Sequence, residues 1–125
     1  MTKLNRTVAE VEADRLVAAA CFTRSCGVTV AAGQGVLKRG SVLGVNSDNK
    51  CILLGAQNED EEVIEAEARY ILNEDCDATD ADTVAIAYEE GRFIKQQLIV
   101  AEGYELTAAD IDALRVHNIG LEDEV

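Results

Sequence analysis

Short apolar runs separated by glycine-rich or acidic turns make up most of the hydrophobic pattern of this chain. Val28–Val30 and Val42–Val45 are rich in β-branched residues, and the segment between them carries glycines at positions 33, 35 and 40. Glycine adopts positive φ at little cost, so closely spaced glycines mark tight turns of the backbone. The pattern predicts a strand, a glycine turn, a short strand, a second turn near residue 40 and another strand.

The middle of the chain continues the strand pattern. Residues 42–45 and 50–54 predict a hairpin, because the Ser47-Asp48-Asn49 segment between them is rich in residues that tolerate turn conformations. Residues 57–62 form a polar, acidic loop in this interpretation. Residues 65–72 contain helix-favouring Glu and Ala, but their polar and apolar positions alternate, which favours a half-buried strand.

The C-terminal third predicts further strands followed by one helix. Residues 83–88 alternate as a strand, the Glu89-Glu90-Gly91 segment predicts a turn, and residues 92–100 predict one or two further short strands. Thr107 and Asp110 form a capping-box signature at the start of a helix. The sequence therefore predicts a helix that packs on the sheet.

The helix expected after Thr107 has an apolar stripe along one side and residues typical of a helix C-terminus at its end. Asn118 near its end, with a glycine two residues later, suits a left-handed C-cap. His117 in the last turn is expected to complement the helix C-terminus or to face solvent. The segment 122–124 is expected to be exposed and frayed. The apolar stripe comprises Ala108, Ile111, Leu114 and the aliphatic part of Arg115.

Length and charge restrict the class of protein. The 125 residues suit one domain, the sequence contains no 18-residue apolar run, and the N-terminus lacks a secretory signal pattern, so we expect synthesis in a cytoplasm. Eleven basic residues against 24 acidic ones give a formal net charge of −13. Binding to nucleic acid depends on Lys and Arg neutralising phosphates, so this balance speaks against nucleic acid and anionic membranes as partners.

The residues that carry chemistry are sparse. The four cysteines lack the spacing of a zinc or redox pair, and reduced, mostly buried thiols are expected. Residues 73–82 predict a solvated acidic turn rather than a calcium loop, because Asp80 and Ile86 stand where glycine and glutamate are required. We therefore expect no metal and no cofactor. A Cys76–His117 dyad stays open, but the poor site chemistry favours a protein that works by binding.

Four segments, in order, resemble the tailed-phage head decoration proteins of the lambda protein D-like family. They are V-T-V-A-A-G-Q-G-V-L-K-R-G-S-V-L-G at 28–44, A-R-Y-I-L-N-E-D-C-D-A-T at 68–79, G-R-F-I-K-Q-Q-L at 91–98 and A-L-R-V-H-N-I at 113–119. The resemblance implies a mainly β (α+β) fold, a small β-barrel or β-clip-like domain over residues 28–125 with a C-terminal helix packed on it. It also implies an extended N-terminal arm over residues 1–27, although Thr7 and Glu10 locally permit a short helix at about 8–19.

The resemblance also implies a function. Proteins of this family form homotrimers on the outer surface of the virion head at three-fold and quasi-three-fold positions. They bind after the shell has expanded and clamp subunits of the major capsid protein against the pressure of packaged DNA. An acidic adaptor of another assembly and a small oligomeric enzyme using the Cys76-Asp77 region are the alternatives.

The expected contact residues lie near the N-terminal end of the resembling region. Phe22 and Val17 are expected as apolar anchors, since a large aromatic in a Gly- and Ala-rich arm needs a place to bury. For residues 28–30 the alternative is that they are only the first strand of the domain's own sheet. The full capsid-binding set is Leu16, Val17, Phe22, Thr23, Val28, Thr29 and Val30, and the expected trimer interface is Gly33, Gln34, Gly35 and Lys38.

Overall fold

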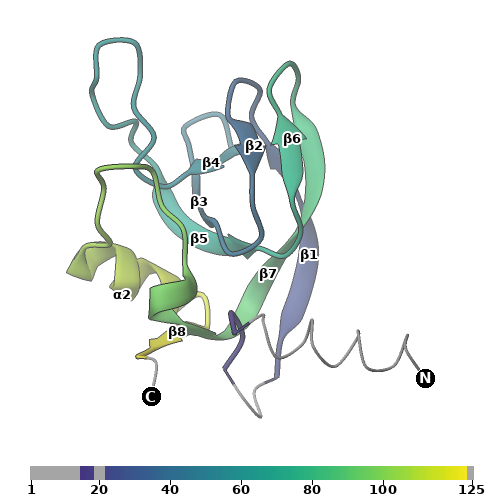
Figure 1. The fold of residues 1–125 in the computed structure, drawn as a ribbon. Coiled ribbons are helices and arrows are strands. Elements are labelled where there is room, and N and C mark those ends of the chain that lie inside the picture. Colours follow the sequence, from purple (N-terminus) through teal and green to yellow (C-terminus); the bar gives the residue numbers. More distant parts are fainter. Residues whose placement is uncertain (1–14, 19–21, 124–125) are drawn as a thin grey trace.

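Five strands close into a barrel in the order β1, β4, β3, β5 and β7, with β1 pairing with β7 to complete the ring (Figure 1). The computed structural model describes residues 15–18 and 22–123. The strands are β1 (Arg24–Val30), β2 (Gly35–Leu37), β3 (Val42–Val45), β4 (Cys51–Leu53), β5 (Glu67–Leu72), β6 (Cys76–Ala78), β7 (Thr83–Ile94) and β8 (Ile119–Glu122); the helices are η1 (Lys95–Gln97) and α2 (Ala108–Val116).

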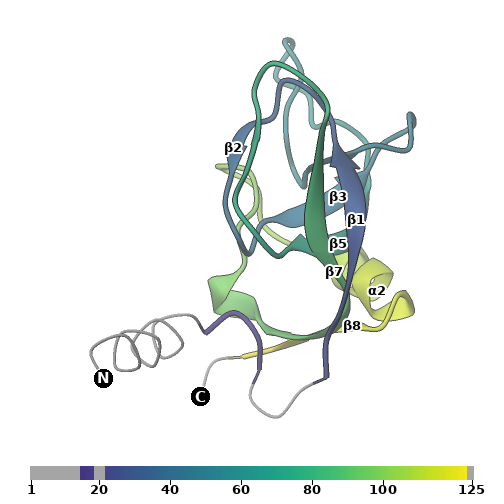
Figure 2. The same cartoon turned by 90° about the vertical axis from the view of Figure 1, so that its right-hand side faces the viewer.

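The two seams that β1 makes are unequal in length. On one side β1 pairs antiparallel with β7 along its whole length, from Arg24 opposite Glu90 to Val30 opposite Thr83. On the other side it pairs parallel with β4 at a single position, Val30 opposite Cys51. The barrel is therefore closed tightly at one end of β1 only. Figure 2 shows β1 and β7 running side by side down the barrel.

One hydrophobic core fills the barrel. Inward-facing residues alternate with exposed ones along β1, where Val28 and Val30 are buried and Thr29 is exposed. The small sheet of β2 and β6 covers this interior and adds Leu37 and Ala78 to the core. Alternation of this kind is expected for a sheet with one face on the core and one in water.

A second core lies between the barrel and the elements below it in Figure 1. Strand β8 runs parallel to the end of β7, and α2 packs against β5 and β8. Phe93, Leu114 and Ile119 are almost completely inaccessible to solvent there. The long strand β7 therefore contributes to both cores and connects them.

Several local predictions are confirmed. Gly33, Gly35 and Gly40 have φ values of 88°, 72° and 97°, which are the turn conformations that their spacing predicted. Strands β3 and β4 form the expected hairpin, and β5 is a strand rather than a helix. Thr107 caps α2 with a complete capping box.

The helix end also follows its prediction in part. Asn118 has the left-handed φ of 65° that the sequence predicted, and His117 is the C-cap residue. The expected apolar stripe is narrower, since Leu114 is the only buried residue of α2, whereas Ala108 and Arg115 are exposed.

The prediction of a turn at Glu89-Glu90-Gly91 is wrong. Strand β7 continues through these residues to Ile94, and η1 replaces the short strands expected beyond it. Gly91 has φ 148°, and a Cβ there would come within 3.1 Å of the Thr23 Cγ2 atom and 3.2 Å of the Phe93 ring. Gly91 thus allows close packing inside a strand instead of ending it.

Two further strands were missed. Part of the acidic segment 73–82, expected to be a solvated turn, forms β6, which pairs with β2. Glu122, expected to be frayed, is the last residue of β8. Strand β1 begins at Arg24, four residues before the expected start of the β domain at residue 28.

Candidate functional site

The residues expected to contact a partner divide by burial into two groups. Leu16, Val28 and Val30 are 3%, 8% and 0% exposed and belong to the two cores. For Val28 and Val30 this is the alternative interpretation, in which they form the first strand of the domain's own sheet. Phe22 and Thr29 are exposed, and Val17 and Thr23 are half-buried.

Residues 15–18 are held against the end of β7 by main-chain hydrogen bonds. The Ile94 N–H donates to the Leu16 carbonyl at 2.8 Å, and the Ala18 N–H donates to the Arg92 carbonyl at 3.0 Å. Val17 forms an isolated antiparallel bridge with Phe93. This part of the expected arm is therefore integrated into the folded body.

An apolar strip lies on the outer face of the β1–β7 pair. Val84 and Ile86 are 73% and 41% exposed, and they lie opposite Thr29 and Gly27 of β1. Phe22, two residues before β1, is 80% exposed. Val84 and Ile86 lie two residues apart on the same face of β7, and neighbouring exposed apolar groups indicate an interaction surface. We define Phe22, Thr29, Val84 and Ile86 as the outer strip.

The loop expected at the trimer interface, which contains Gly33, Gln34 and Gly35, is held by hydrogen bonds to neighbouring strands of the domain. Gly33 and Gln34 both donate their main-chain N–H groups to the Ala78 carbonyl, and the Gln34 side chain accepts a hydrogen bond from the Leu53 N–H at 2.9 Å. Lys38 is exposed and forms a 3.4 Å ion pair with Asp75. The loop is thus a rigid projection whose glycines have open space above them.

Aspartates tie together the loops at the barrel end that Figure 1 places uppermost. Asp82 accepts hydrogen bonds from Lys50 Nζ at 2.6 Å and from the Ala32 N–H at 2.8 Å, and these hold its pKa below the ordinary value. Hydrogen bonds from Thr79 likewise lower the pKa of Asp77. These carboxylates act as turn-stabilising acceptors in the structure.

A polar groove that sequence reasoning missed runs beside the free part of β1. One section, with a cavity volume of about 250 Å³, is lined by Arg24, Glu89 and the end of α2. A second section of about 300 Å³ is lined by Gly27, Val28 and Thr29 of β1 and by residues from β3, β4 and β5. Arg69 and Tyr70 line both sections and so connect them.

The charges in this groove are only partly paired. Arg24 Nε lies 2.8 Å from a Glu89 carboxylate oxygen. The Arg69 Cζ atom lies over the Tyr70 ring, 5.3 Å from its centroid, and Arg69 makes no ion pair within the described part of the chain. No local sequence signal identifies Arg69, because its neighbours are brought together by barrel closure.

The described cysteines are free thiols. Cys51 is buried in the barrel core, whereas the Lys38 side chain is exposed to solvent. Burial, with Cys26 nearby, raises the pKa of Cys51 to about 11. Within residues 15–18 and 22–123, no group of three His, Cys, Asp or Glu side chains is placed to hold a metal ion. His117 lies 3.6 Å from Glu67.

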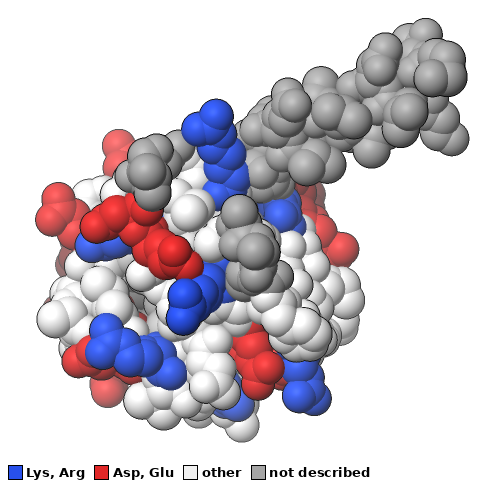
Figure 3. Space-filling model, turned by 90° about the horizontal axis from the view of Figure 1, so that it is seen from below, with Lys and Arg blue, Asp and Glu red and all other residues white. Residues whose placement is uncertain are grey.

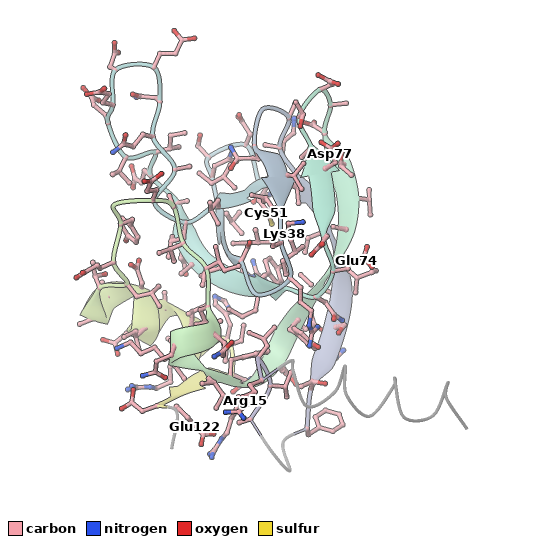
Figure 4. All side chains as sticks on the ribbon, in the orientation of Figure 1. Arg15, Lys38, Cys51, Glu74, Asp77 and Glu122 are labelled. Atoms are coloured by element: carbon pink, nitrogen blue, oxygen red, sulfur yellow. The ribbon has the colours of Figure 1, made fainter. Side chains whose placement is uncertain are left out.

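The surface shows mixed charge on the face with β8. Figure 3 shows basic and acidic side chains interspersed there, without a large patch of one sign. Figure 4 places Arg15 and Glu122 at this end of the molecule. In the part of the chain that is described, no helix has the length and apolar character needed to cross a bilayer.

Comparison with known proteins gives one result that covers most of the chain. A family model described as bacteriophage lambda head decoration protein D matches residues 9–119. A search of curated proteins gave no match. The matched region contains the entire barrel and α2.

Proposed function

Because the chain belongs to the family of bacteriophage lambda head decoration protein D, a phage capsid decoration family, we propose that it binds expanded heads as a homotrimer. The trimers occupy three-fold and quasi-three-fold positions and clamp neighbouring major capsid subunits against internal DNA pressure. The family is a structural one of the virion surface. The match over residues 9–119 is the observation that carries this proposal.

The outer strip supports a contact of this kind. Burying Phe22, Val84 and Ile86 against a partner removes apolar surface from water, which contributes about 25 cal/mol for each Å². Val17 and Thr23 are half-buried residues close to Phe22 in the sequence, and both stay in the proposed contact set. Leu16, Val28 and Val30 act indirectly, by fixing the strands that present the exposed residues.

A trimer can attach firmly to the head even when each of its contacts with the shell is weak. Three copies held together engage the shell at several points, so the second and third contacts form at high effective concentration. In the proposed trimer the rigid loop of Gly33, Gln34 and Gly35 faces the neighbouring copy. Lys38 supplies a positive charge there between copies that each carry a net charge of −13.

Binding to expanded, undecorated heads tests the proposed attachment. The wild-type protein is expected to co-sediment with such heads to saturation and to appear by electron microscopy as density at the local three-fold positions. Phe22→Ala is expected to weaken binding by about tenfold while leaving the melting temperature unchanged. Val63→Ala is the matched control, because Val63 is an exposed valine outside the outer strip.

The oligomeric state is tested separately. Sedimentation of the free protein shows whether it forms trimers in solution. The symmetry of its density on the head shows whether it is a trimer when bound. Lys38→Glu is expected to weaken trimers, whereas Lys95→Glu, an exposed lysine on η1, leaves them intact. Bound density without three-fold symmetry would contradict the trimer, and failure of the wild-type protein to bind any expanded head would contradict the attachment.

A further inference from the structure

The groove beside β1 contains an unpaired sheet edge. Toward β4, β1 has one paired position, Val30 opposite Cys51, whereas the same strand is fully paired with β7 on its other side. The groove sections lie where the second partner of β1 would run. Gly27 and Thr29 are exposed within it.

The orientation of the free main-chain groups follows from the strand period. The Ala31 N–H donates to the Cys51 carbonyl at 2.9 Å, so odd-numbered residues direct their polar main-chain groups toward the β4 side. Successive residues of a strand point these groups to opposite edges, which places those of Gly27 on the open side. Apart from the pair at Val30, no strand among the described residues pairs with β1 on that side.

The groove offers more than a main-chain edge. Tyr70 and Arg69 of β5 stand opposite β1, and the Arg69 guanidinium is exposed between the two sections. Val116, 76% exposed, adds an apolar wall at the end of α2. Extended peptides that add a strand to a sheet gain affinity from main-chain hydrogen bonds and specificity from such flanking side chains.

We propose that this groove receives an extended segment of the major capsid protein, which pairs with the free edge of β1 and places a carboxylate on Arg69. The identity of the partner, the major capsid protein, is taken from the proposed function. A symmetric pairing of two β1 edges would give a two-fold dimer, which does not fit a three-fold assembly. The positive Arg69 within an acidic protein selects an acidic segment of a different chain.

Gly27→Pro tests the main-chain pairing. Proline removes the N–H group of residue 27 from the open edge but leaves the ladder with β7, since the N–H groups bonded to β7 come from even-numbered residues. Binding to expanded heads is expected to weaken at least tenfold. Gly27→Ala is the matched control with wild-type binding expected, because a Cβ at this position meets nothing within 4 Å.

Arg69→Gln tests the charge contact without altering the main chain. A loss of roughly tenfold in affinity is expected, since a hydrogen-bonded charge pair is removed. Arg115→Gln is the control, because Arg115 is also an exposed arginine but lies on α2, paired with Asp112 outside the groove. Unchanged melting temperatures would establish that both Arg69→Gln and Gly27→Pro act on binding.

Hydrogen exchange gives a readout independent of any variant. Amide exchange over residues 24–30 is expected to slow when the wild-type protein binds heads. If wild-type protein binds but exchange there is unchanged, or both variants bind normally, the groove proposal is overturned while the decoration function stands. Slowed exchange that appears with rising protein concentration without heads would assign the groove to a second copy and overturn the capsid occupant.

Discussion

The guanidinium of Arg39 lies over the ring of Tyr88, with Cζ 5.4 Å from the ring centroid, and donates a hydrogen bond to the Tyr88 hydroxyl at 2.8 Å. The same guanidinium nitrogen donates to the carbonyl and side-chain oxygens of Asn73. Tyr88 in turn packs against Phe93, with ring centroids 5.1 Å apart. Arg39 therefore joins the turn before β3 to the end of β5 and the middle of β7.

Replacing Arg39 is expected to destabilise the fold. Arg39→Met leaves the Tyr88 hydroxyl and the Asn73 oxygens without their donor, and the free energy of unfolding should fall by about 2 kcal/mol. Urea denaturation measures this change. Lys38→Met is the control. It should lower the free energy of unfolding by less than about 0.5 kcal/mol, because the ion pair of Lys38 with Asp75 is exposed to solvent. Equal losses for the two variants would contradict the role of Arg39.

Gly55 is expected to tolerate no side chain. A Cβ at Gly55 would lie 2.3 Å from the Tyr104 Cγ atom, and the residue has φ 88°. Gly55→Ala should lower the free energy of unfolding by about 3 kcal/mol through overpacking and backbone strain. Gly103 has a similar φ of 82°, but a Cβ there would meet nothing within 4 Å. Gly103→Ala should therefore lower the free energy of unfolding by only about 1 kcal/mol, through backbone strain alone. Thermal denaturation of both variants separates the steric from the conformational effect.

Leu16 and Phe22 are expected to respond oppositely to truncation. Leu16→Ala opens a cavity beside the second core and should reduce the free energy of unfolding by about 2–3 kcal/mol. Phe22→Ala removes a side chain that is 80% exposed, and the change should stay within about 0.5 kcal/mol. Chemical denaturation checks both, and a large loss for Phe22→Ala would show that its ring supports the fold of the free protein.

Alkaline pH is expected to weaken the fold through Cys51. Its pKa is raised from 9.0 to about 11 because the buried thiol disfavours the charged form. A raised pKa in the folded state stabilises the protein below pH 9, and this contribution is lost as the pH rises toward 11. Cys51 contributes at most about 1.4 kcal/mol per pH unit to this decline.

Cys51→Ala provides the comparison for that pH dependence. The variant should be less stable at neutral pH, but its free energy of unfolding should fall less steeply between pH 9 and 11. A decline as steep as that of the wild-type protein would assign the effect to other groups whose pKa values are raised by burial, such as Tyr70 and Cys26.

Local chemistry alone identified the turns, the β3–β4 hairpin and the start of α2. The positive φ of Gly33 and the capping box of Thr107 depend on residues a few positions away, so the sequence determines them directly. The four family segments likewise indicated the family that the match over residues 9–119 shows.

Only the tertiary structure decided how distant strands pair. The residues around Gly91 look like a turn locally, yet pairing with β1 and β8 extends β7 through them. Val28 and Phe22 are both apolar residues near the start of the domain, but barrel closure buries one and leaves the other exposed. The free edge of β1 beside Arg69 arises in the same way, because which strand edges stay open depends on contacts between residues far apart in the chain.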